Sequence, residues 1–208
     1  MLTTVCFVRH GETEANVTDR LQGQTDTPLN AQGLAQADLV AARLKDEPFD
    51  FILSSDLSRA LTTAEKIAAG RPVIALEELR EWHVGKWQGM LLKDILNDYA
   101  EEFRLFKSGS LDFEPPEGES AGRFLERAER FMGMLLREYS GKRILCVSHG
   151  GFIKQTLKVV LGLRTFRSLP ACENTALCRY ASKEGNPWQL VSWNDASHLK
   201  SFNRSTGW

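Results

Sequence analysis

Short apolar runs alternate along this chain with segments in which apolar residues recur every three or four positions. The apolar runs predict buried strands, at residues 3–8, 49–53, 73–76 and 143–147. The periodic segments predict helices, at residues 29–44, 57–68, 119–139 and 152–163. Two further strands are expected late in the chain, at 174–182 and 187–194. This alternation predicts an α/β fold, a three-layer sandwich in which helices flank a mostly parallel central sheet.

Two of the predicted helices carry more detailed expectations. Asn30 is expected to cap the helix at 29–44, because asparagine accepts hydrogen bonds from the first free backbone N–H groups. The buried face of that helix is expected to contain Leu34, Ala37, Ala41 and Leu44. In the helix at 119–139, the Arg and Glu residues of the sequence FLERAERF (124–131) are expected on a solvated face.

Length and charge narrow the function classes. With 208 residues and a net charge of −1, the chain is expected to form a single domain, residues 1–208, with no general attraction to nucleic acid or to an anionic membrane. It lacks a signal-peptide pattern and an apolar run long enough to span a membrane. The four cysteines lack the Cys-x-x-Cys spacing that is typical of metal sites. We therefore expect them to be reduced thiols in a cytoplasmic protein. The sequence leaves open whether the chain forms a homodimer.

Polar residues follow three of the predicted strands at once. Arg9, His10 and Gly11 follow the first strand, the sequence SSDLSR (54–59) follows the second, and SHGG (148–151) follows the strand at 143–147. Ligands of open α/β sheets bind beyond the carboxyl ends of the strands. We therefore expect two histidines and two arginines, distant in sequence, to lie together at one edge of the sheet.

These residue types favour a phosphate site. Arginine donates paired hydrogen bonds to phosphate oxygens, and helix N-termini after the loops would add backbone N–H donors. His10 could bind the anion as a cation or attack phosphorus as a neutral nucleophile, and neighbouring arginines favour the neutral form. Gly11 is expected to let the backbone approach a ligand. Glu81, in the stretch LREWHVGKWQG, could protonate a leaving oxygen, and Trp82 and Trp87 are expected near this chemistry.

Four motifs occur in a recognisable order: RHGE at residue 9, SSDLSR at 54, EWHVGKWQG at 81 and SHGG at 148. With them, the chain resembles the histidine phosphatase superfamily, which includes the cofactor-dependent phosphoglycerate mutases, over nearly its whole length from Val5 to Leu199. The resemblance implies that His10 is the nucleophile that becomes phosphorylated and that Glu81 is the proton donor.

The resemblance also implies the remaining site residues. It implies that Arg9, Arg59 and His149 bind the phosphoryl group. It also implies that the substrate pocket is lined by Asn16, Gln22, Gly23 and Gly150. It implies a small phosphorylated metabolite as substrate and no cofactor. No metal is expected either, because cationic side chains take the place of a metal ion. We assign no catalytic role to His83 or His198.

Residues 90–118, MLLKDILNDYAEEFRLFKSGSLDFEPPEG, predict a helical cap inserted over the site. Mutases of the family resemble one another in a longer insertion here, with an Arg-Arg pair followed by several prolines. This chain has only Arg104 and the pair Pro115-Pro116. The sequence therefore favours hydrolysis over phosphoglycerate mutase activity.

A module without catalysis and a zinc site are both disfavoured by the residues present. A phosphate-binding or interaction module that has lost catalysis would be expected to lose the nucleophile or the acid, and both His10 and Glu81 are present. A zinc site built from histidines and Glu12 is disfavoured, because His-Gly-Glu lacks the helical histidine spacing of metalloproteases.

Overall fold

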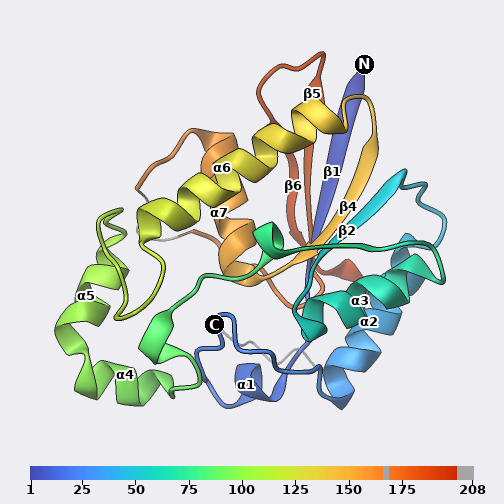
Figure 1. Ribbon diagram of the computed structural model, residues 1–208. Coiled ribbons are helices and arrows are strands. Elements are labelled where there is room, and N and C mark those ends of the chain that lie inside the picture. The colour runs from blue at the N-terminus through green and yellow to red at the C-terminus, as the bar shows by residue number, and fades with distance from the viewer. Residues whose placement is uncertain (166–168, 201–208) are drawn as a thin grey trace.

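The computed structural model describes residues 1–165 and 169–200 and contains one six-stranded sheet (Figure 1). The strand order is β3-β2-β4-β1-β5-β6. The strands are β1 (Leu2–Arg9), β2 (Phe51–Ser55), β3 (Ile74–Leu76), β4 (Arg143–Ser148), β5 (Leu177–Lys183) and β6 (Gln189–Asp195). Strands β1 to β4 pair in parallel, and β5 and β6 add an antiparallel edge next to β1. The predicted α/β class with a mostly parallel sheet is confirmed.

Helices cover both faces of this sheet (Figure 1). One face carries α2 (Ala31–Leu44) and α3 (Ser58–Ala68), and the other carries α6 (Ala121–Glu138) and α7 (Gly150–Leu161). Side chains of β1 alternate between the two cores, as a strand with both faces buried requires. Val5 and Phe7 pack in the core beneath α6 and α7, whereas Cys6 and Val8 pack in the core beneath α2 and α3.

Helix α2 begins as predicted, and its buried face agrees with the prediction except at Leu34. The Asn30 side chain accepts a hydrogen bond from Gly33 N at 2.7 Å and so caps the helix. Leu34 is 39% exposed, so its predicted place in the core is wrong. Ala37 and Leu44 are buried as predicted and Ala41 packs against the same core, and the buried face also includes Gln36 and Val40. The start of α2 packs directly on the backbone after β1, where Gln36 Oε1 accepts a hydrogen bond from Glu12 N, and this contact sets the rotation of the helix.

The packing of the start of α2 on the backbone after β1 also explains why residue 11 is a glycine. A Cβ at Gly11 would lie 2.4 Å from the carbonyl oxygen of Gly33, and a Cβ at Gly33 would lie 2.0 Å from that of Glu12. The two glycines therefore let two backbone segments pack closely. This packing alone accounts for the glycine at position 11, so the expected close approach of a ligand is not required.

A third group of elements lies beside the carboxyl ends of the parallel strands (Figure 1). It comprises α4 (Leu92–Asp98) and α5 (Ala100–Ser108), with the short α1 (Glu14–Val17) nearby. Its own hydrophobic core surrounds the fully buried Trp87, and includes Ile95, Phe103 and Phe113. Single-turn 3₁₀ helices occur at Glu77–Leu79, Gly85–Trp87 and Ser197–Leu199.

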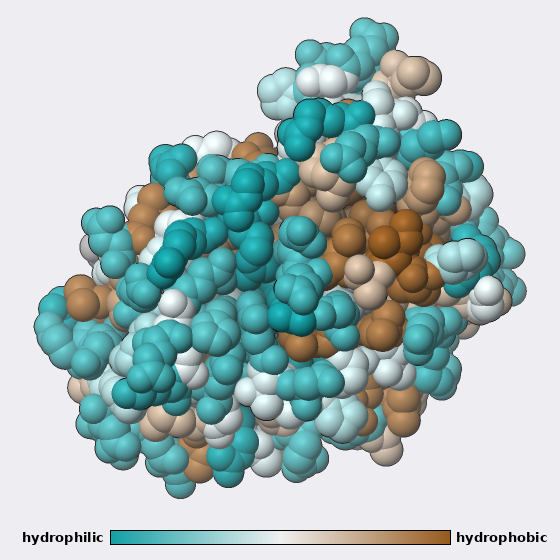
Figure 2. Space-filling model, viewed as in Figure 1, coloured by the Kyte–Doolittle hydropathy of each residue, from teal (hydrophilic) through white to brown (hydrophobic). Residues whose placement is uncertain are grey.

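None of the helices in the described part of the chain is long and apolar enough to cross a bilayer. The face seen in Figure 1 is hydrophilic over most of its area, with a larger hydrophobic region right of centre and smaller ones scattered elsewhere (Figure 2). Exposed large hydrophobic side chains include Phe51 of β2 and Ile74 of β3, towards one edge of the sheet. Neither residue lines the cavity described next.

Candidate active site

His10 directly follows β1 and is only 3% exposed. Its Nδ1 lies 2.7 Å from the carbonyl oxygen of Gly11, and since a carbonyl only accepts, Nδ1 carries the ring proton. Burial lowers the pKa of His10 well below its ordinary value, and the positive charges of Arg59 and Arg9 lower it further. The ring is therefore neutral, with its lone pair on Nε2, the atom suited to nucleophilic attack.

Two arginines flank this ring without a carboxylate partner in the described part of the chain. Arg9 Nη1 donates to the carbonyl of Cys172 at 2.7 Å. Arg59 is completely buried and donates to the carbonyls of Thr25 and Gly23, both at 2.8 Å. Burial lowers the pKa of Arg59 to about 10, so the group stays protonated at neutral pH. Carbonyl oxygens thus fix both guanidinium groups and leave their charge available to an anion.

His149 lies beside His10 because their strands are in register. Arg9 pairs with Ser148 across β1 and β4, and the two imidazole rings that follow have centroids 5.2 Å apart. His149 is fully buried, with Nε2 2.9 Å from Ser55 Oγ at the end of β2. Burial and the charge of Arg59 lower the pKa of His149 well below its ordinary value. Its Nδ1 has no hydrogen-bond partner among the described residues.

The carboxylate of Glu81 lies at the N-terminus of α7. Its Oε2 accepts from Gly151 N at 2.8 Å, and its Oε1 accepts from Phe152 N at 3.1 Å and from Trp82 N at 2.9 Å. A Cβ at position 151 would lie only 2.2 Å from Oε1, so glycine there makes room for the carboxylate.

Arg127 of α6 holds the loop that carries Glu81. Its guanidinium donates to the carbonyls of Glu78, Arg80 and Glu81 at 2.6 to 3.1 Å and forms two hydrogen bonds with the carboxylate of Glu119. The side chain is 12% exposed. The predicted solvated face is therefore wrong for Arg127, because a loop distant in sequence covers this part of the helix.

Three predicted pocket residues lie on the segment after β1. The side-chain oxygens of Asn16 and Gln22 accept hydrogen bonds from Thr13, which leaves their amide N–H groups without an acceptor in the described ranges. Gly23 has a φ of +52°, and a Cβ there would lie 2.7 Å from the side chain of Gln88. Glycine is thus required at this turn, which presents its carbonyl to Arg59.

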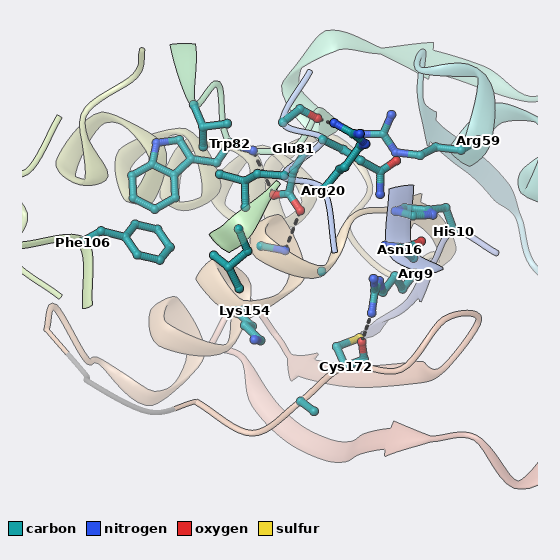
Figure 3. A pocket seen from close by; sticks show the side chains of 18 of the residues that line it. Arg9, His10, Asn16, Arg20, Arg59, Glu81, Trp82, Phe106, Lys154 and Cys172 are labelled. Atoms are coloured by element: carbon teal, nitrogen blue, oxygen red, sulfur yellow. Dashed lines mark hydrogen bonds between the residues drawn. The ribbon is translucent and has the colours of Figure 1, made fainter. Parts of the chain in front are cut away.

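These groups surround a cavity of about 340 Å³ (Figure 3). Of the residues predicted from sequence, those that line it are Arg9, His10, Asn16, Gln22, Gly23, Arg59, Glu81 and Gly150. His149 lies beside His10 and is not part of the lining, and neither are His83 and His198. Trp82 lines the cavity as expected, whereas Trp87 is buried in the core of the α4–α5 region.

Sequence reasoning missed the rest of the wall. The additional lining residues include Arg20, Val84, Leu92, Phe103, Phe106, Lys107, Lys154 and Cys172. Figure 3 shows Phe106 and Trp82 on one side of the cavity and His10, Arg9 and Arg59 on the other, with Glu81 between them. One signal could have identified Lys154, because this lysine follows the SHGG motif by one helical turn.

Metal ligands do not gather in the described residues: no group of three His, Cys, Asp or Glu side chains could hold an ion. The Glu12 carboxylate, a candidate zinc ligand by sequence, accepts hydrogen bonds from Asn30 and Gln32. The four cysteines are buried and unpaired, with 3.9 Å between the sulfur atoms of Cys172 and Cys178.

Comparison with known proteins gives a consistent result over nearly the whole chain. A family model for the histidine phosphatase superfamily (branch 1) matches residues 5–196. The chain is 35% identical over 206 residues to the "Metal-independent phosphoserine phosphatase" of Arabidopsis thaliana, covering 96% of this chain and 84% of that protein. It is also 35% identical over 204 residues to the "Probable phosphoglycerate mutase GpmB" of Serratia proteamaculans, covering 94% of each.

A solved structure is similar as well. The crystal structure of a mutant phosphoserine phosphatase from Entamoeba histolytica, in complex with phosphoserine, matches with a TM-score of 0.85 at 32% sequence identity. The match covers 95% of this chain and 99% of that one.

Proposed function

This chain belongs to the histidine phosphatase superfamily (branch 1), and from that premise we propose that it hydrolyses small phosphomonoesters through a phosphohistidine at His10. One observation carries the proposal. The neutral His10 ring donates its Nδ1 proton to Gly11 and keeps its Nε2 lone pair beside two arginines that have no carboxylate partner in the described part of the chain. A nucleophile and a cationic phosphate site therefore coincide in one cavity.

In the first step, the lone pair of His10 Nε2 attacks phosphorus in line with the leaving oxygen. The P–O bond to the alcohol breaks, and its electron pair stays on the alcohol oxygen. Glu81 enters this step in its protonated form and donates its carboxyl proton to that oxygen. The products are the free alcohol and an enzyme phosphorylated on His10.

In the second step, a water molecule attacks the phosphohistidine from the side that the alcohol has left. Glu81, now a carboxylate, accepts a proton from this water, and the P–N bond breaks with its electron pair returning to Nε2. Inorganic phosphate leaves, and both His10 and Glu81 regain their starting states.

Positive charge for both steps comes from the protein. Arg9 and Arg59 are already oriented by backbone carbonyls, so they stabilise the phosphoryl oxygens with little reorganisation. His149, with an unpartnered Nδ1 beside His10, adds a third contact to the phosphoryl group. The amide N–H groups of Asn16 and Gln22 bind the oxygens that face solvent. We therefore propose a mechanism without a metal.

The cavity size and the relatives indicate the substrate class. A volume of about 340 Å³ is at the small end of ligand pockets, which favours a small phosphorylated metabolite. A relative and a structural neighbour are named as phosphoserine phosphatases. A screen of small phosphomonoesters, with release of inorganic phosphate as the readout, tests the proposal, and release from none of them would refute it.

Mutase activity is the competing function, because a relative at 35% identity is named as a phosphoglycerate mutase. A mutase must return the phosphoryl group from histidine to a second oxygen before water reacts. The segment 90–118 lacks the Arg-Arg pair of the mutase-like insertion, and it has only the two prolines Pro115 and Pro116 where that insertion has several. Given 3-phosphoglycerate and catalytic bisphosphoglycerate, the enzyme should release phosphate faster than it forms 2-phosphoglycerate. The opposite order would identify a mutase.

A further inference from the structure

Lys154 lies where it can reach the outer part of the cavity. It is on α7, four residues after Gly150, which corresponds to about 6 Å along the helix axis. Side chains on a helix lean towards its N-terminus, so Lys154 leans back towards the end of α7 that carries Glu81. Lys154 lines the cavity between the His10 side and the Phe106 side (Figure 3).

This ammonium group is half-buried and has no hydrogen bond or ion pair with any described residue. Burial lowers the pKa of Lys154, and the positive charge of Arg9 lowers it further. Lys66 and Lys86, by comparison, each pair with a carboxylate. Lys158 of the same helix also has no ion pair among the described residues, but it does not line the cavity. A partly desolvated cation without a partner is unfavourable, and an anion bound beside it would offset that cost.

The surroundings of Lys154 indicate what kind of molecule carries this anion. Phe106 and Trp82 stack with ring centroids 5.3 Å apart and form an apolar wall of the same cavity. Lys107 also lines the cavity, but it is exposed and lies over the ring of Phe103. Arg20 also lines the cavity, but it is exposed and donates to the carbonyl of Gly89 at 2.8 Å. The outer cavity thus combines apolar surface with one half-buried positive charge, that of Lys154, and it lies beyond the phosphate site as seen from His10.

We propose that Lys154 binds a carboxylate carried by the alcohol part of the substrate, while the phosphoryl group of the same molecule lies at His10. The inference rests on the proposed phosphatase function and narrows it to phosphorylated hydroxy acids and related compounds. The half-buried ammonium of Lys154 balances the single charge of a carboxylate, whereas a second phosphate dianion would depend for its remaining charge on Arg20 and Lys107, which are exposed and screened by solvent. The apolar wall accommodates the short carbon chain that joins the two charged groups.

The test uses two ligands that differ only in this group. 3-Phosphoglycerate carries a carboxylate where glycerol 3-phosphate carries a hydroxymethyl group. Both are titrated calorimetrically into His10→Ala protein, which binds without turnover. We expect 3-phosphoglycerate to bind more tightly, and the affinity ratio to fall about 10- to 100-fold when Lys154→Met is added, as for the loss of a charged hydrogen bond.

Two further variants serve as controls. Lys158→Met removes the same charge one turn further along α7, outside the cavity lining, and should leave the ratio unchanged. Lys154→Arg should retain most of the preference. Lys154→Gln provides a second neutral variant, and thermal unfolding verifies that each protein is folded.

The outcomes separate this inference from the proposed function. An affinity ratio that does not depend on Lys154, or the absence of 3-phosphoglycerate binding, overturns the carboxylate site even if wild-type enzyme hydrolyses phosphomonoesters. A Lys154-dependent preference in a protein that hydrolyses no phosphomonoester supports the site and refutes the phosphatase.

Discussion

Replacing Gly151 with alanine should displace the general acid without harming the fold. The new Cβ would lie 2.2 Å from Glu81 Oε1, whereas ordinary contacts begin at 3.4 Å, so the carboxylate must move by more than 1 Å. It can do so, because it is the end of a flexible side chain. Its hydrogen bonds to Gly151 N and Phe152 N, at 2.8 and 3.1 Å, are lost or lengthened.

The size of the effect follows from the role of Glu81. A misplacement of about 1 Å can cost about 10²-fold in rate, and general acid catalysis contributes about 10²–10⁴-fold. We therefore expect formation of the phosphoenzyme from an aliphatic phosphate to slow about 100-fold in Gly151→Ala. With p-nitrophenyl phosphate the loss should be much smaller, because that leaving group needs little protonation. Alanine is favoured over glycine in a helix by about 0.5–1 kcal/mol, so the melting temperature should change by no more than about 4 °C.

Single-turnover rates are the appropriate measurement, since the later attack of water also uses Glu81. Gly150→Ala is the matched control: it makes the same change one residue earlier, where the Cβ would lie 3.3 Å from Arg9 Nε and not against Glu81. It should affect both substrates alike. Equal losses for both leaving groups in Gly151→Ala would refute the assignment of Glu81 as the acid in this position.

The same site yields three more expected outcomes. Activity should persist in excess chelator, because arginines supply the positive charge; loss that only a divalent ion restores would contradict this. Glu81→Gln should slow phosphoenzyme formation from an aliphatic phosphate by about 10²–10⁴-fold and from p-nitrophenyl phosphate much less, whereas Arg59→Ala should slow both alike. The lowered pKa of His10 means that protonation is opposed by burial and by Arg59, so its ring should stay neutral as pH falls through about 6.5. Heteronuclear NMR of the imidazole checks this in ligand-free enzyme, and a midpoint near the ordinary value would contradict it.

The inner half of the site could be predicted from sequence because topology alone brings its members together. Arg9 ends β1, and His10 and His149 directly follow the neighbouring parallel strands β1 and β4, whose register places the two histidines side by side. Arg59 begins the helix after a third strand of the same edge. Local patterns identify such strand ends, and no knowledge of side-chain packing is needed.

The outer half of the site, which includes Phe106, depends on how segments distant in sequence pack against one another. The spacing of apolar residues along the chain does not predict such packing. Phe106 reaches the cavity only because α5 packs around Trp87. Helical spacing places Arg127 among charged residues and so predicts a solvated position, yet the Glu78–Glu81 loop covers it. The prediction for Leu34 fails for a similar reason, since the backbone after β1 sets the rotation of α2.

The phosphorylated residue itself provides the most direct test of the account. Enzyme mixed with radiolabelled substrate and quenched within one turnover should carry label in a linkage that is labile to acid and stable to alkali, as a phosphohistidine is. Mass spectrometry should place the phosphoryl group on His10, and His10→Ala should carry none while keeping its circular dichroism spectrum. An acid-stable linkage, label on another residue, or retained turnover in His10→Ala would contradict the mechanism.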